Sequence, residues 1–135
     1  FDDWKSGPLP KLKRVIQRHV QDAPRRYGIL ADYTGHGIGT SMHQPPDVPN
    51  TGRPGRGPRL TEGLVLAVEP MVTRGSAQGV TLDDEWTVVT SDGSRAAHWE
   101  HTITVTAHGL WVLTAADGGE AELAGRGLPF GPLAD

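Results

Sequence analysis

Imidazole and carboxylate side chains are the groups of this sequence best suited to chemistry. His36 and His43 lie in the stretch GHGIGTSMH, Glu69 closes the apolar run LVLAVEP, and Glu100 lies within AAHWEHTITVT. Nitrogen and oxygen donors without sulfur suit Mn, Fe, Co or Zn in a hydrolytic site, where a bound metal activates water. His36, Glu69 and Glu100 are therefore candidate metal ligands if the fold brings them together.

A purely structural role is the alternative for each of these residues. A loop histidine most often contacts a backbone group, and the spacing of His36 and His43 matches no common zinc motif. Glu69, followed by Pro70, could accept a hydrogen bond from a neighbouring backbone N–H group. Glu100 could be a solvated residue on the open side of a sheet. The residue types alone leave both interpretations open.

The composition limits the classes of function. A chain of 135 residues fits one domain of moderate core. It has no cysteine, which excludes disulfides, thiolate ligands and thiol catalysis. A net charge of −3 provides no basic field for nucleic acid or an anionic membrane surface. Apolar runs fall short of the roughly 20 residues of a membrane span. We therefore expect a cytoplasmic protein without a direct nucleic-acid or membrane partner.

Elements that would position the candidate ligands follow from periodicity and from Gly and Pro. Apolar residues at helical spacing predict an amphipathic helix over residues 11–23. A short strand is expected at 28–33, leading into a glycine-rich turn at 35–39 that carries His36. Residues 45–60, rich in Pro and Gly, predict a surface loop.

The remainder is rich in β-strand signals and predicts two antiparallel hairpins. The expected strands cover residues 64–70, 85–90, 96–106 and 110–114. Alternation along 96–106 places His98 and Glu100 on one polar face, and Trp99, His101 and Ile103 on the other. Residues 1–10 read as an irregular leader and 118–135 as a flexible tail, so that 11–117 form the folded body.

Four blocks together indicate a family. The sequences YTGHGIGTSMHQPPDVPN, LTEGLVLAVEPMV, DDEWTVVTSDGSRAAHWEHTITVT and GLWVLT resemble, in order and spacing, the second half of type I methionine aminopeptidases. The resemblance covers about residues 10 to 117. It implies an α+β pita-bread fold, with a curved antiparallel sheet and covering helices, of which this chain is one half. It also implies an enzyme that uses two divalent metal ions (Co, Mn, Fe or Zn) to release N-terminal methionine from nascent proteins.

The resemblance also implies roles for single residues. His36, Glu69 and Glu100 match metal ligands of the family, and Glu69 could relay a proton during catalysis. His43 matches the histidine that contacts the scissile amide of the substrate. Met42 and Trp86 match positions that line the pocket for the methionine side chain, although a tryptophan is also a common core or interface filler.

Parts of the family pattern have no counterpart here. The paired aspartate ligands and the substrate-binding histidine of the family's first half are absent, and Met42 and Gln44 stand where many relatives carry Phe and Glu. We therefore expect a fragment or a truncated gene product, whose partners would be the missing N-terminal half, N-terminal peptides of nascent proteins and, as a further candidate, the ribosome. A prolidase-like dipeptidase and a non-catalytic module that binds peptides or ribosomes are the alternatives.

Overall fold

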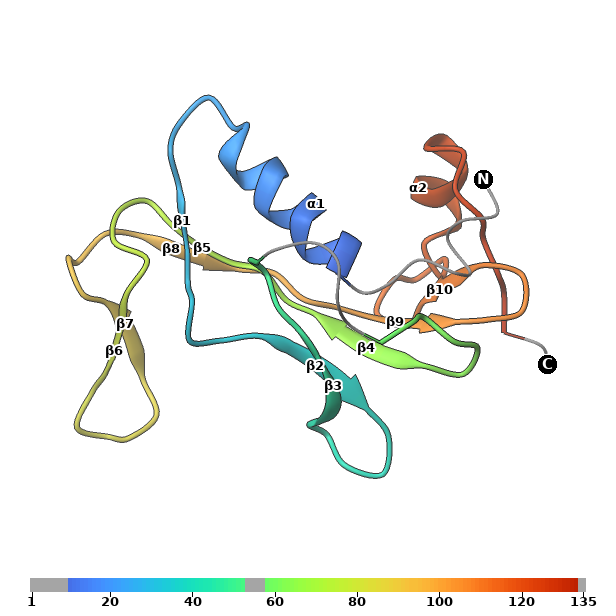
Figure 1. Cartoon of the computed structure of the whole chain (residues 1–135), viewed down its shortest axis with the longest axis horizontal. Coiled ribbons are helices and arrows are strands. Elements are labelled where there is room, and N and C mark those ends of the chain that lie inside the picture. Colours follow the sequence, from blue (N-terminus) through green and yellow to red (C-terminus); the bar gives the residue numbers. More distant parts are fainter. Residues whose placement is uncertain (1–9, 53–57, 134–135) are drawn as a thin grey trace.

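A computed structural model describes residues 10–52 and 58–133 (Figure 1). Its first element, α1 (Pro10–Gln21), confirms the helix expected over 11–23. The helix ends shortly before Pro24, which disfavours helical backbone at the residue that precedes it. Leu12 packs against the buried core residues Val48 and Leu66, so that α1 is held against the sheet.

The largest sheet has five antiparallel strands in the order β10-β9-β4-β2-β3. These are β2 (Gly35–Ile38), β3 (Gln44–Val48), β4 (Val65–Val68), β9 (His101–Val105) and β10 (Leu110–Val112). A three-stranded sheet has the order β1-β5-β8 and a two-stranded hairpin pairs β6 with β7. These strands are β1 (Gly28–Ile29), β5 (Met71–Thr73), β8 (Ala96–His98), β6 (Gly79–Thr81) and β7 (Val88–Thr90).

Two chain paths run from the five-stranded sheet into the three-stranded sheet. One path is β4 followed by β5, and the other is β8 followed by β9; each is interrupted for two residues, at Glu69–Pro70 and at Trp99–Glu100. The β4–β9 and β5–β8 ladders have a common register, so these two breaks lie opposite one another. We call this place the seam. The strand expected at 64–70 therefore ends at Val68, before the seam, and the strand expected at 96–106 is divided by the seam into β8 and β9.

The region of residues 35–48 differs from expectation because strands replace a turn and a loop. The glycine-rich stretch forms β2, a central strand between β3 and β4, and the start of the expected 45–60 loop forms β3, an edge strand. An edge position tolerates Pro45 and Pro46, which lack N–H donors. Glycine is required at residue 37 because the backbone of β3 approaches it closely. A Cβ on Gly37 would lie 2.5 Å from the carbonyl oxygen of Pro45. Residues 53–57 of the expected loop lie outside the described residues.

Regular structure also occurs after residue 117, where the sequence shows little periodicity. Helix α2 (Glu120–Gly125) follows two glycines in left-handed conformation, Gly118 and Gly119. Further along, Phe130 stacks on Trp111 of β10, with ring centroids 5.5 Å apart. The contact of Phe130 with Trp111 joins the residues after α2 to the sheet. The boundaries of leader, body and tail stay predictions.

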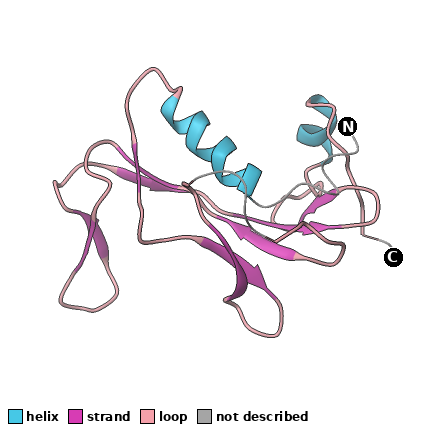
Figure 2. Ribbon diagram, viewed as in Figure 1, coloured by secondary structure: helices cyan, strands magenta, loops and turns pink. Residues whose placement is uncertain are grey.

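Both helices lie on the same side of the sheets, and the β2–β3 and β6–β7 hairpins extend toward the other side (Figure 2). Trp99 and Ile103 line a groove together with Leu12 of α1 and Leu123 of α2. This confirms the expected alternation, with Trp99 and Ile103 on the helix-covered face. Neither α1 nor α2 has the length and apolar character of a membrane-spanning helix.

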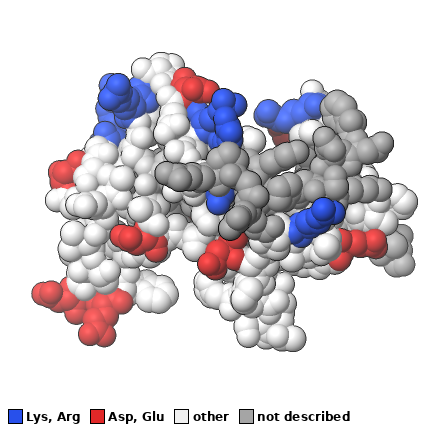
Figure 3. All heavy atoms as spheres, viewed as in Figure 1, with Lys and Arg blue, Asp and Glu red and all other residues white. Residues whose placement is uncertain are grey.

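Charged side chains are separated over the surface. In the view of Figure 3, acidic side chains gather over the β6–β7 hairpin and basic ones lie over α1. The loop of that hairpin carries Asp83, Asp84 and Glu85 in succession. Asp84 accepts hydrogen bonds from the side chain and backbone of Thr87 and from the backbone of Trp86, which lower its pKa.

Candidate metal centre

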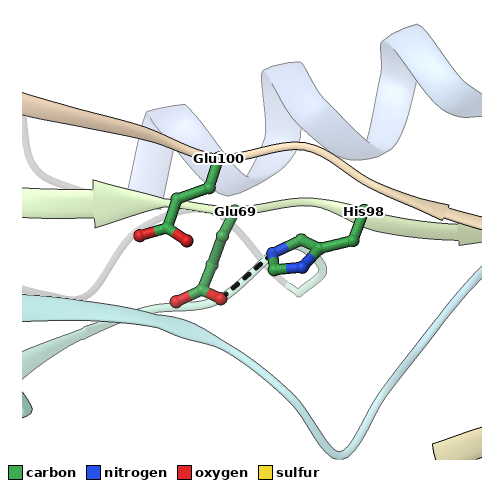
Figure 4. A group of neighbouring side chains, drawn as sticks. All are labelled: Glu69, His98 and Glu100. Carbon is green, nitrogen blue, oxygen red and sulfur yellow. Dashed lines mark ion pairs between the residues drawn. The ribbon is translucent and has the colours of Figure 1, made fainter. Parts of the chain in front are cut away.

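Glu69 occupies the seam and is largely buried. It follows the last residue of β4, and the common register of the two ladders places it opposite Glu100. Its neighbours Val68 and Pro70 line the groove beneath α1 and α2. Glu69 therefore points to the other face, and Figure 4 shows Glu69 and Glu100 extending away from the helix.

His36 reaches Glu69 from the neighbouring strand. It pairs with Ala67 in the β2–β4 ladder, and Ala67 precedes Glu69 by two residues, so His36 and Glu69 share one face. His36 Nε2 lies 3.4 Å from Glu69 Oε1, and the exposed fractions of the two side chains are only 11% and 12%. The structure thus brings two of the expected ligands into direct contact.

His98 contacts the other oxygen of the same carboxylate. Its Nε2 atom lies 3.3 Å from Glu69 Oε2 (Figure 4). One possible ligand atom each from Glu69, His98 and Glu100 lie within 4.8 Å of one another. Glu69 therefore has one imidazole at each carboxylate oxygen and a second carboxylate close by.

A backbone contact sets the orientation of the His36 ring. His36 Nδ1 lies 3.0 Å from the carbonyl oxygen of Gly37. Since a carbonyl only accepts, Nδ1 carries the proton in this bond, and in a neutral ring Nε2 then presents its lone pair. This lone pair faces a carboxylate oxygen, so two acceptors meet where a cation belongs, and that cation is either a proton or a metal ion. In metal-binding histidines, one ring nitrogen likewise donates its proton to a backbone carbonyl or carboxylate while the other nitrogen binds the metal.

The donor set fits a divalent transition metal. The described residues offer imidazole nitrogens and carboxylate oxygens at one place, and the sequence has no thiolate. Such donors suit Mn, Fe, Co and Zn. The largely buried position of His36 and Glu69 favours paired charges, because an unpaired buried carboxylate is costly. We conclude that these residues can hold a divalent cation.

His43 lies beside the proposed ligands. Its ring and that of His36 have centroids 4.0 Å apart, at an interplanar angle of 43°. His43 immediately precedes β3 and its side chain is exposed. It is therefore next to the candidate metal site and open to a molecule that approaches from solvent.

Met42 and Trp86 are placed on the two hairpins. Met42 lies between β2 and β3 and is 68% exposed, and Trp86 lies in the β6–β7 hairpin and is 87% exposed. Both hairpins extend from the sheets on the side away from α1 and α2 (Figure 1). This is the side to which Glu69 and Glu100 point. The two apolar side chains are therefore available to line a binding surface on this side.

Sequence reasoning missed two residues of the site. His98 had a signal, because it shares the polar face of the expected 96–106 strand with Glu100. Asn50 had none: it lies in the Pro- and Gly-rich segment, yet it is 2% exposed and its Nδ2 donates to the backbone carbonyl of Glu69 at 3.2 Å. Asn50 thus anchors the backbone of Glu69.

Comparisons with known proteins give a consistent result. Residues 7–107 match the model of metallopeptidase family M24. Methionine aminopeptidase 1 of Mycobacterium tuberculosis is 61% identical over 110 residues, which cover 78% of this chain and 41% of that protein. Methionine aminopeptidase 1 of Bacillus subtilis is 45% identical over 106 residues, which cover 78% of this chain and 42% of that protein. The chain therefore spans about two fifths of the length of these relatives.

Solved structures agree. The crystal structure of methionine aminopeptidase from Thermotoga maritima has a TM-score of 0.74 and 44% identity, over 79% of this chain and 42% of that one. The corresponding enzyme from Rickettsia prowazekii has a TM-score of 0.75 and 39% identity, over 81% and 44%. These likenesses confirm the expected pita-bread fold. They also show that this chain covers less than half of each of the two solved structures. The match over residues 7–107 shows that the chain belongs to metallopeptidase family M24.

Proposed function

We propose that this chain supplies part of the catalytic centre of a metal-dependent aminopeptidase that releases N-terminal methionine from nascent proteins. The observation that carries the proposal is the convergence of His36, Glu69 and Glu100 on one face of the seam, with His43 exposed beside them. The names of the similar proteins support the reaction and the substrate class. The relatives' greater length leaves room for further ligands outside this chain.

Metal binding is assigned to His36, Glu69 and Glu100. Two divalent ions, when bound, would supply a water of lowered pKa and polarise the carbonyl of the first peptide bond. Co, Mn, Fe and Zn are all compatible with these donors. Glu100 is exposed and Glu69 largely buried, so Glu69 is the more rigid of the two carboxylates.

Proton movement is assigned to Glu69 and amide contact to His43. A Glu69 oxygen can accept a proton from the attacking water and return it to the leaving amine. His43 lies on the solvent side of His36, from where its ring can donate a hydrogen bond to the amide as charge develops on it. His43 thus acts on the substrate while the other residues hold the metal.

Substrate selection is assigned to Met42 and Trp86. Both are large, exposed and carried by hairpins on the side of the metal centre. A thioether and an indole ring suit the flexible apolar side chain of methionine. Substrates would be the N-terminal peptides of proteins under synthesis, which places the reaction in the cytoplasm and makes the ribosome a candidate partner.

Reconstitution tests the proposal. The segment of the Mycobacterium tuberculosis relative that precedes the matched region is added to this chain, either fused or as a separate polypeptide, and release of methionine from Met-Ala-Ser is measured with added Mn²⁺ or Co²⁺. We expect hydrolysis that Glu100→Gln abolishes and that His108→Ala, a change at an exposed turn, leaves intact. Cleavage of dipeptides with Pro second, without release of methionine, would instead indicate a prolidase-like enzyme. Peptide binding without hydrolysis would indicate a non-catalytic module.

A further inference from the structure

We propose that His98 is itself a metal ligand, which joins Glu69 and Glu100 to form a donor face for one divalent ion. The proposal rests on the metal centre described above and adds a residue to it. The resemblance to the aminopeptidases assigns no role to His98. The geometry around Glu69 Oε2 is the basis of the proposal (Figure 4).

The distances match donors that share an ion. Around a tetrahedral ion with bonds of about 2.1 Å, neighbouring donor atoms lie about 3.4 Å apart. His98 Nε2 and Glu69 Oε2 are 3.3 Å apart. All three donor atoms lie within 4.8 Å of one another. The 4.8 Å limit is wider than this spacing, so the exposed side chains of His98 and Glu100 would have to rotate slightly to reach one ion.

The backbone holds the three residues in place for this role. His98 is the last residue of β8 and pairs with Met71, and Glu100 follows it by two residues, opposite Glu69 across the seam. Both strand paths change from one sheet to the other here, which explains why ligands from different segments meet. The His98 side chain is 48% exposed, so an ion from solvent can reach its Nε2 atom.

The competing explanation is that His98 only positions Glu69. In that role an Nε2–H group would donate to Glu69 Oε2 and no metal bond would form. A glutamine at residue 98 could keep such a donor, since its amide carries two N–H groups. A glutamine could not replace an imidazole nitrogen as a metal ligand of similar strength. The two roles therefore differ in their response to His98→Gln.

The test uses Zn²⁺ and the full 135-residue chain. Long-range ¹H–¹⁵N NMR spectra of the histidine rings are recorded during titration, and affinity is measured by calorimetry. We expect the Nε2 signal of His98 to shift and saturate with bound Zn²⁺ while the signals of His108 stay unchanged. His98→Ala and His98→Gln should both weaken Zn²⁺ binding by at least about tenfold. Even residues that only hydrogen-bond to a metal ligand typically reduce the affinity by about tenfold or more when they are replaced.

Each outcome of the Zn²⁺ titration either supports or overturns the proposal that His98 is a ligand. Wild-type affinity in His98→Gln, or an unshifted Nε2 signal of His98 at saturation, would overturn the proposal in favour of a positioning role or none. Binding that is lost in His36→Ala but kept in His98→Ala would overturn it and leave the proposed function intact. Absence of Zn²⁺ binding by the wild-type chain would overturn the proposal for His98, whereas the proposed function is decided by hydrolysis in the reconstituted enzyme. Circular dichroism of each variant separates ligand loss from unfolding, and the wild-type NMR titration requires no variant.

Discussion

Replacing Gly37 by alanine should destabilise the fold through the close packing of β2 against β3. A Cβ at residue 37 would lie 2.5 Å from the Pro45 carbonyl oxygen and 2.8 Å from that of Gln44. Both neighbours are backbone atoms, so no side-chain rotation relieves the contact. Ordinary contact begins at 3.4 Å, and β3 must therefore move by about 0.9 Å.

The expected loss of stability is a few kilocalories per mole. Overpacking that forces backbone shifts costs about 1–3 kcal/mol, and we expect about 2 kcal/mol here because β2 is held on its other side by β4. For a chain of this length, each kilocalorie lowers the melting temperature by about 3–5 °C, which gives about 6–10 °C. Movement of β3 would also shift His43 away from His36.

Thermal and urea unfolding followed by circular dichroism measure this loss. Gly125→Ala is the matched control, because a Cβ there meets nothing within 4 Å and the residue ends α2. The control should be neutral or more stable by up to about 1 kcal/mol. Equal melting temperatures for Gly37→Ala and Gly125→Ala would refute the argument that close approach of β2 and β3 requires glycine in this motif.

Three further outcomes follow from single contacts. Asn50→Ala removes the donor, from a buried side chain, to the partly buried Glu69 carbonyl, and should lower the unfolding free energy by about 1–3 kcal/mol in urea titrations. The pKa of Asp92 is lowered to about 2, chiefly by the backbone N–H of Ser76, so Asp92 stabilises the fold above its unfolded value of 3.8. That contribution should fade as the pH falls from 3.8 toward 2, and Asp92→Asn should flatten this part of the stability profile. In the reconstituted enzyme, His43→Ala should lower kcat but keep the metal content, measured by atomic emission; loss of metal would contradict its role as a substrate contact.

Much of the framework could be predicted because it depends on local pattern. Helix α1 follows from apolar spacing that Pro24 interrupts, and β4 and β9 follow from apolar and alternating runs. The alternation along residues 96–106 also predicted which side chains share a face of the sheet. That Glu69 has partners could also be expected, because a carboxylate at the end of a buried strand needs one, and its contacts with His36 and His98 confirm this.

Other features depend on tertiary pairing that periodicity does not encode. The glycine-rich motif looks like a turn locally, but it forms β2 between β3 and β4, and β3 approaches so closely that only glycine fits at residue 37. The strand over 96–106 shows no sequence break at the seam, since Trp99 and Glu100 continue the alternation. The seam, the contact of His98 with Glu69 and the anchoring by Asn50 emerge only when distant segments are brought together.

Binding of a divalent ion through Glu69 is the central claim, and a calorimetric titration of the 135-residue chain with Mn²⁺ tests it most directly. Glu69 is the residue that contacts both His36 and His98. We expect the wild-type chain to bind one ion weakly, because the proposed function draws further ligands from outside this chain. Glu69→Gln, which keeps the shape and removes the charge, should abolish that binding. Two tight sites in the wild type, or unchanged binding by Glu69→Gln, would contradict the account.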